Sequence, residues 1–191
     1  MPLPIPEPGL VVRYAYLWHS EYERGREEGD KNRPCAIILT AINEDGDTVV
    51  TVLPVTHTSP RLENDAVELP LAVKQRLGLD DARSWVVVNE MNRFVWPGPD
   101  LRPIPPTEAG RFDYGLLPPG LFRAIRERFL AAAQAQRSRI VPRTEQRVAR
   151  PRHLGNSSTL RFFARPSSVA FEATGACNPT PLATIRLVGI P

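Results

Sequence analysis

The sequence predicts an α+β fold that is mainly β: a small barrel-like sheet of mostly antiparallel strands with a short helix and a C-terminal helix. Short apolar runs recur along the first part of the chain and are separated by Gly, Pro, Asn and Asp, which is typical of short strands joined by turns. An Asp-Gly pair between two of these runs is a hairpin signal, because it tolerates the positive φ of such turns. Helical periodicity is clear only near the end of the regular region.

The first elements are three strands with a long loop after the first. Residues 9–18 alternate apolar and bulky side chains as a strand does, and residues 34–42, PCAIILTAI, form the continuous apolar run of a buried strand. Residues 48–56 follow the turn NEDGD and are the expected antiparallel partner of 34–42. The highly charged segment 19–33 is predicted as a solvated loop.

The elements that follow are shorter and end in proline-rich sequence. They are a loop at 57–65, a strand at 66–70, a helix at 71–79, a strand at 84–96 and a closing segment at 97–106. Gly78 is predicted to end the helix, because glycine readily takes the left-handed conformation after a last turn. A second strand starting near Arg93 is an alternative to one continuous strand at 84–96.

The last regular element is an amphipathic helix within residues 118–139. Its apolar residues recur at helical spacing: Leu121, Phe122, Ile125, Phe129, Leu130 and Ala133. Two prolines precede it and basic residues fill its last turn, as the helix dipole favours. We expect its apolar face to pack on the sheet; a partner-binding helix is the alternative.

Composition divides the chain after Glu145. Residues 146–191 hold six arginines, no lysine and one acid, for a net charge of +5, whereas residues 1–145 carry −2. We therefore predict a barrel domain at 1–145 and a basic, Pro/Ser-rich, poorly ordered extension at 146–191. The overall charge of +3 gives no nucleic-acid argument for the main domain, so any such argument rests on particular arginines.

Several protein classes are excluded by composition. No segment approaches the roughly 20 consecutive apolar residues of a membrane span, and the first residues, MPLPIPEPGL, lack the basic region of a secretory signal peptide. Cys35 and Cys177 make no disulfide framework, and a buried reduced thiol is expected for Cys35. The three histidines, at 19, 57 and 153, show no metal-ligand spacing. We expect a cytoplasmic protein without a metal or other cofactor.

Two polar side chains stand at the outer ends of the predicted hairpin. Arg33 directly precedes the strand 34–42, and Thr56 ends its partner. A turn centred near Asp45 pairs residue 34 with residue 56, so Arg33 and Thr56 should lie close together at one end of the sheet. A guanidinium and a hydroxyl held on rigid strand ends suit an anionic oxygen. The alternatives are an Arg33 salt bridge to a loop acid (Glu27, Glu28 or Asp30) and a Thr56 hydroxyl that only completes a turn.

The two strand ends resemble motifs of a known family. NRPCAIIL is similar to the Arg-Pro strand of the PemK/MazF toxins, and VLPVTHT is similar to their V-x-P-[IV]-T-[SH] strand end, in the same order around a hairpin turn. The resemblance spans about residues 9–106 and is expected to include the C-terminal helix, but it does not reach the extension. It implies an SH3-like barrel, a homodimer and a metal-independent endoribonuclease that cuts single-stranded RNA and is neutralised by a cognate antitoxin.

The resemblance also implies roles for individual residues. Arg33 and Thr56 would be the catalytic pair, with Arg33 stabilising the charge that develops on the phosphoryl oxygens. Glu28 matches the glutamate of the family's first-loop G-H-E-Q motif, although the histidine of that motif is missing here. Arg93 is the candidate for the arginine of the family's D-Q-x-R-T-x-D strand, displaced by one residue, and the final aspartate has no counterpart. Glu28 and Arg93 are therefore candidates for RNA contacts.

Histidines and aromatic residues supply further candidates. His57 directly follows Thr56 and could act as a catalytic acid or base, but strand alternation turns it away from Thr56 unless a turn intervenes. His19 opens the charged loop and is a candidate RNA contact. Trp18, Trp85, Phe94 and Trp96 could stack bases; Trp85 is expected in the core, and Trp96, beside Pro97 and Gly98, is the expected exposed stacking residue.

A second class of function stays open at this stage. Because the family's histidine and aspartate are missing, the alternative to a nuclease is a nucleic-acid-binding or regulatory module on the same barrel, without turnover. An inactive toxin relative is a third possibility, suggested by the break in composition after Glu145.

Overall fold

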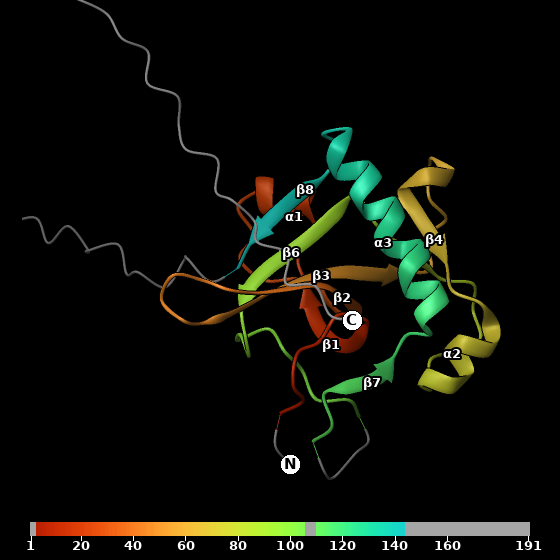
Figure 1. Ribbon diagram of the computed structural model, residues 1–191, viewed down its shortest axis with the longest axis horizontal. Coiled ribbons are helices and arrows are strands. Elements are labelled where there is room, and N and C mark those ends of the chain that lie inside the picture. The colour runs from red at the N-terminus through yellow and green to blue at the C-terminus, as the bar shows by residue number, and fades with distance from the viewer. Residues whose placement is uncertain (1–2, 106–109, 144–191) are drawn as a thin grey trace, which may run out of the picture. The chain divides into compact units, whose positions relative to one another are not determined.

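Two long antiparallel strands, β2 (Lys31–Ile42) and β3 (Thr48–Thr56), form the centre of the fold (Figure 1). The structure is a computed structural model and describes residues 3–105 and 110–143. Gly46 takes a φ of 87° in the turn between the strands, which the Asp-Gly signal predicts. The predicted hairpin is confirmed, and the predicted extension at 146–191 lies outside the described residues.

The other strands are added to both edges of this hairpin. They are β1 (Leu10–Tyr16), β4 (Ala66–Glu68), β5 (Trp85–Val87), β6 (Glu90–Val95), β7 (Asp113–Leu116) and β8 (Arg139–Pro142). The main path of the sheet runs β4-β5-β3-β2-β1-β7, while β6 pairs with β3 and β8 pairs parallel to β6. The described part of the chain is thus a mostly antiparallel half-barrel with short helices, which confirms the α+β, mainly β class.

Each face of the central strands packs against its own buried cluster. The helix-face cluster consists of Val11, Ala36, Ile38, Leu53, Val55, Leu69, Leu77, Val86, Val88, Met91, Leu117, Ile125 and Phe129. The aromatic-face cluster consists of Leu10, Val12, Tyr14, Tyr16, Cys35, Ile37, Val50, Val52, Phe94 and Leu101. Alternation along the strands sends neighbouring residues into different clusters, so the cluster that a residue joins tells which face it occupies.

The helices lie where the periodicity places them, with shorter bounds. The α2 helix (Leu71–Leu77) ends at Gly78, whose φ of 68° is the left-handed conformation expected there. The α3 helix (Pro119–Gln134) packs Ile125 and Phe129 into the helix-face cluster. It ends before residue 139 because the chain turns back there to form β8.

Four local predictions need correction. The charged segment 19–33 contains a short helix, α1 (His19–Glu23), and a single-turn helix, η1 (Glu63–Asp65), lies in the predicted loop 57–65. The amide of Trp18 donates to Glu21 Oε2 at 3.1 Å, which starts α1. β2 begins at Lys31 rather than at residue 34, because Lys31 pairs with Tyr16 of β1. Residues 84–96 form two strands, β5 and β6, as in the alternative, but the second strand starts at Glu90 rather than near Arg93. β7 and β8 were not predicted, because strands of four residues are too short to show alternation.

Candidate nucleic-acid site at the open ends of β2 and β3

The register of the β2–β3 hairpin determines which residues meet at its open end. On the turn side Leu39 pairs with Thr51, and on the open side Ile37 pairs with Val52. Ile38 is therefore an extra residue in β2 and forms a β-bulge. The last pair is Cys35 with Pro54. Continued by two residues, this register sets Arg33 opposite Thr56. The predicted pairing of residue 34 with residue 56 was wrong by one residue, because the bulge was not visible in the sequence.

Alternation assigns both side chains to one face of the sheet. Cys35 and Ile37 belong to the aromatic-face cluster, and Arg33 lies on the same side at a spacing of two residues. Val50 and Val52 belong to that cluster from β3, and Thr56 follows them with the same parity. Register and alternation therefore assign Arg33 and Thr56 to the aromatic face at the open end of the hairpin, beyond its last paired residues, where β2 pairs with β1 and β3 pairs with β5.

The Arg33 guanidinium is packed against an aromatic ring rather than against a carboxylate. Its central carbon lies 5.0 Å from the centroid of the Trp18 ring. Its Nε is buried without a hydrogen-bond partner in the described part of the chain. No salt bridge joins Arg33 to Glu27, Glu28 or Asp30 there, and Asp30 pairs with Arg26 instead. The guanidinium thus keeps donors that an anionic ligand could use.

Thr56 is half-buried, and within the described part of the chain its side chain makes one hydrogen bond. Its Oγ1 accepts a hydrogen bond from the Thr58 amide at 3.2 Å, which is the turn contact expected for a strand-end hydroxyl. The hydroxyl proton can still be donated to a ligand, because this contact uses only a lone pair. Its cross-strand partner on the other side is Trp85 of β5.

Glu90 is a candidate that sequence reasoning missed. It begins β6, and the pairing of Val52 with Asn92 places Glu90 across from Pro54, on the same face as Asn92 and Phe94. Its carboxylate is only 19% exposed; Oε2 accepts the His19 amide hydrogen at 3.3 Å, and Arg139 lies 3.9 Å from Oε1. Its spacing of four residues from Phe94 indicates a position on the same face. That signal could be used only if a new strand was known to start at residue 90.

The start of α1 brings two predicted candidates to this edge. Trp18 covers Arg33, and the amide of the next residue, His19, is held by Glu90. The His19 imidazole is partly buried, with Nδ1 3.5 Å from Glu23 Oε2. Contacts join Arg33 to Trp18 and His19 to Glu90, while register and alternation assign Thr56 and Glu90 to the same face. We call these residues, Arg33, Thr56, Glu90, Trp18 and His19, the open-edge cluster.

His57 takes part in a different network. Its Nε2 lies 3.0 Å from Asp80 Oδ2, in the segment after α2. Asp80 also accepts a hydrogen bond at 2.8 Å from Lys74, whose side chain is only 2% exposed and also donates to Ser84 Oγ at 2.7 Å. The hydrogen bond from Lys74 lowers the pKa of Asp80 below its ordinary value. Because α2 covers the helix face, this contact agrees with the alternation that turns His57 away from Thr56.

We expect Asp80→Asn to destabilise the fold at neutral pH, because it leaves the buried Lys74 ammonium without its carboxylate partner. Since the pKa of Asp80 is depressed, its contribution is present above its ordinary pKa and is lost as the pH falls through the folded value. Urea unfolding across the acidic range should show the difference between wild type and variant shrinking below about pH 4. A difference that stays constant with pH would contradict the assignment.

The remaining predicted contacts lie elsewhere. Arg93 is exposed and pairs with Thr51. Its neighbour Phe94 faces the aromatic-face cluster, so Arg93 occupies the opposite face of the sheet from Arg33. Glu28 is exposed on the loop before β2. Trp96 is not the exposed platform expected, because its ring is half-buried and stacks 6.4 Å from that of Phe94.

The other two aromatic residues are Phe94 and Trp85, and Trp85 does not lie in the core as expected. Phe94 is 1% exposed and stacks on Tyr14 at 4.7 Å, as a core residue does. Trp85 is only half-buried, and the Arg83 guanidinium lies 5.2 Å from its ring centroid. The Trp85 ring is outside the core because its neighbour Val86 takes the inward position on this short strand.

Comparison with known proteins gives no assignment for the chain: no family model matches it, and no curated protein sequence matches it. Within residues 3–105 and 110–143, no three His, Cys, Asp or Glu side chains are grouped so that they could hold a metal ion. No helix in this described part is long and apolar enough to cross a membrane. The function is therefore inferred from the residues of the open-edge cluster.

Proposed function

We propose that the chain is a metal-independent endoribonuclease of the PemK/MazF toxin type, on an SH3-like barrel, that cuts single-stranded RNA. The observation that carries the proposal is the position of Arg33: a half-buried guanidinium without a carboxylate partner among the described residues, on the same face as Thr56, where β2 and β3 separate. Such a donor is pre-organised for the charge that develops on a phosphate during cleavage.

The chemistry assigned to the cluster balances without a cofactor. The 2′-oxygen attacks the adjacent phosphorus and forms a bond, while the bond from phosphorus to the 5′-oxygen breaks. Arg33 and the Thr56 hydroxyl donate to the phosphoryl oxygens, on which negative charge grows. Glu90 accepts the proton of the 2′-hydroxyl, and the His19 imidazole donates a proton to the leaving 5′-oxygen. The products are a 2′,3′-cyclic phosphate and a 5′-hydroxyl.

We expect purified protein to cleave long, unstructured RNA in the presence of EDTA, because none of these steps uses a metal ion. The products should carry 5′-hydroxyl ends that polynucleotide kinase labels without prior dephosphorylation. Cleavage that requires added Mg²⁺, or products with 5′-phosphate ends, would contradict the mechanism. The same preparation heated before the assay controls for contaminating heat-stable ribonucleases.

Two partners belong to the same proposal. A toxin of this type is neutralised by a cognate antitoxin protein and acts as a homodimer, and both are inferred for this chain from the resemblance of its strand-end motifs. Co-expression with the protein encoded beside it should suppress toxicity if the proposal holds.

A second candidate is a nucleic-acid-binding or regulatory module without turnover. One observation favours it: His57, the histidine nearest to Thr56 in the sequence, is held by Asp80 on the helix side. Tight RNA binding without cleavage products, under the EDTA conditions above, would select this candidate.

A further inference from the structure

A small cavity lies at the β4–β5 edge of the sheet, and its lining includes the cross-strand partner of Thr56. Its volume is about 200 Å³, and its walls include Trp85, Glu68, Val67, Pro60, Glu63 and Arg128. Cavities for drug-sized ligands measure about 300–1,000 Å³, so this one suits a single planar ring system rather than a whole nucleotide. Trp85 connects it to the proposed nuclease site, because Trp85 is the cross-strand partner of Thr56.

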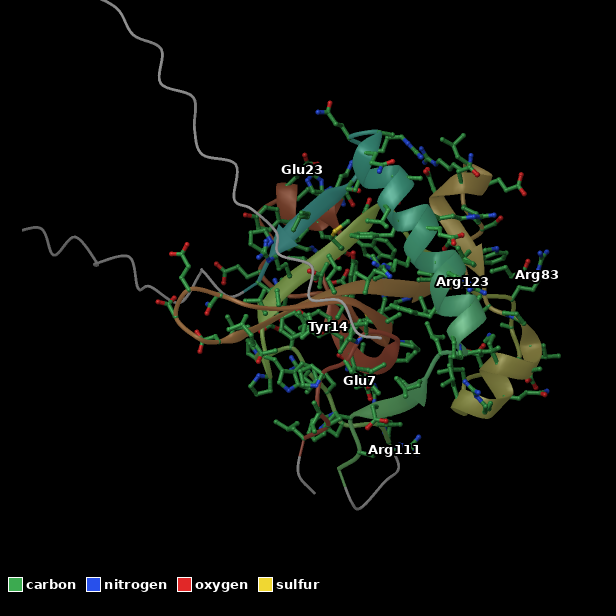
Figure 2. The ribbon with its side chains drawn as sticks, viewed as in Figure 1. Glu7, Tyr14, Glu23, Arg83, Arg111 and Arg123 are labelled. Atoms are coloured by element: carbon green, nitrogen blue, oxygen red, sulfur yellow. The ribbon has the colours of Figure 1, made fainter. Side chains whose placement is uncertain are left out.

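The aromatic wall of this cavity is held in place before any ligand binds. The Arg83 guanidinium lies 5.2 Å from the centroid of the Trp85 ring. Two nitrogens of the Arg83 guanidinium donate to the Glu68 carboxylate, Nε to Oε1 and Nη2 to Oε2, at 2.8 Å each. Figure 2 shows Arg83 at the margin of the molecule, away from Tyr14 in the interior. A half-buried indole covered on one side by a cation is a preformed stacking surface.

The opposite wall is also ordered, and its charge is mixed. Arg128 of α3 donates to the carbonyl oxygens of Glu63 and Ala66 at 2.9 and 2.7 Å, so its guanidinium is already engaged with backbone. Glu63 and Glu68 line the cavity, and the hydrogen bond from Arg83 lowers the pKa of Glu68, which keeps that group ionised. Carboxylates repel phosphate and accept hydrogen bonds from N–H groups, so the cavity favours a nucleobase over the sugar–phosphate backbone of RNA.

We propose that this cavity binds one unpaired nucleobase carrying an exocyclic amino group, next to the phosphate held by Arg33 and Thr56. The base stacks on Trp85, and its amino group donates to the carboxylates at the rim. The inference rests on the proposed function, since it names a base subsite for the same RNA.

The test measures binding separately from cleavage. The ligands are short single-stranded homopolymers of A, C and U with 2′-O-methyl groups, which remove the attacking hydroxyl. Wild type should bind the A and C oligomers more tightly than the U oligomer. Trp85→Ala should weaken binding to the A and C oligomers about tenfold or more, which is within the range for loss of one stacked base. Trp85→Phe should stay within about threefold of wild type, because it retains an aromatic face.

A matched pair of charge variants tests the role of the rim. Glu63→Gln should reduce the preference for A and C over U, whereas Glu44→Gln, in the β2–β3 turn, should leave it unchanged. Equal binding by wild type and Trp85→Ala, or no preference for A and C over U, would overturn the subsite. If binding depends on Trp85 but no cleavage occurs in EDTA, only the proposed nuclease activity is overturned. If Trp85→Ala leaves cleavage unchanged, only the proposed base subsite is overturned.

Discussion

Arg33→Ala should lower RNA cleavage by about 10²–10³-fold, the loss typical of removing one pre-organised donor to a developing anionic oxygen. Arg33 is half-buried over Trp18 and makes no ion pair in the described part of the chain, so its donors are free for the phosphate. The fold should survive, because a partly exposed cation–π contact contributes only about 0.5–1 kcal/mol. Initial cleavage rates and a thermal melt of each variant measure the two effects.

Two companion variants make this result specific. Arg33→Lys should recover only part of the activity, because an ammonium is a point charge and loses the planar fork that fits phosphate oxygens. Arg123→Ala removes an arginine of α3, on the helix side of the sheet, and should leave cleavage unchanged (Figure 2). If Arg33→Ala cuts RNA as fast as Arg123→Ala, the catalytic assignment is wrong.

The sequence predicted the centre of the fold because its signals there are local. The Asp-Gly turn and the apolar runs on both sides are enough to form the β2–β3 hairpin, and the glycine after α2 ends that helix. The β7 and β8 strands could not be predicted, since each exists only through pairing with a distant strand. Four residues give too little alternation to identify a strand in isolation.

The candidate site was predicted in part for a similar reason. Arg33 and Thr56 stand at strand ends, so a correct hairpin brings them to the same end of the sheet. The predicted role of Arg93 depended on which residues of β6 face each side of the sheet. A displacement of one residue places its side chain on the opposite face. Glu90 was missed because its position depends on where β5 stops and β6 starts. Contacts such as that between His57 and Asp80 join segments that no local pattern connects.

The second large effect is expected at the buried ion pair between Asp100 and Arg143. Asp100→Asn should destabilise the protein by roughly 3–5 kcal/mol, because it leaves the buried charge of Arg143 without its partner. The side chains are 6% and 4% exposed, and Arg143 Nη2 lies 2.8 Å from Asp100 Oδ2. Urea unfolding measures the change directly, and the melting temperature should fall by about 10 °C or more.

A double-mutant cycle separates the pair from simple loss of packing. Asp100→Leu combined with Arg143→Met should cost less than the two single changes together, because the double variant leaves no unpaired charge. Asp30→Asn is the surface control: its partner Arg26 is 49% exposed, and such a pair contributes at most about 1 kcal/mol. Additive single effects would show that the two charges do not stabilise each other.

The ion pair also connects stability to the proposed site through Tyr14. The Tyr14 hydroxyl donates to Asp100 Oδ2 at 3.4 Å, and burial raises the pKa of Tyr14, so the donor proton is retained. Tyr14 is the β1 partner of Arg33, and Arg143 also donates to the carbonyl of Glu27 in the loop before β2. Asp100→Asn should therefore reduce cleavage at temperatures where the variant is still folded, because Asp100 contacts Tyr14, the β1 partner of Arg33. The pH profile of the remaining activity should be unchanged, because Asp100 does not touch the RNA.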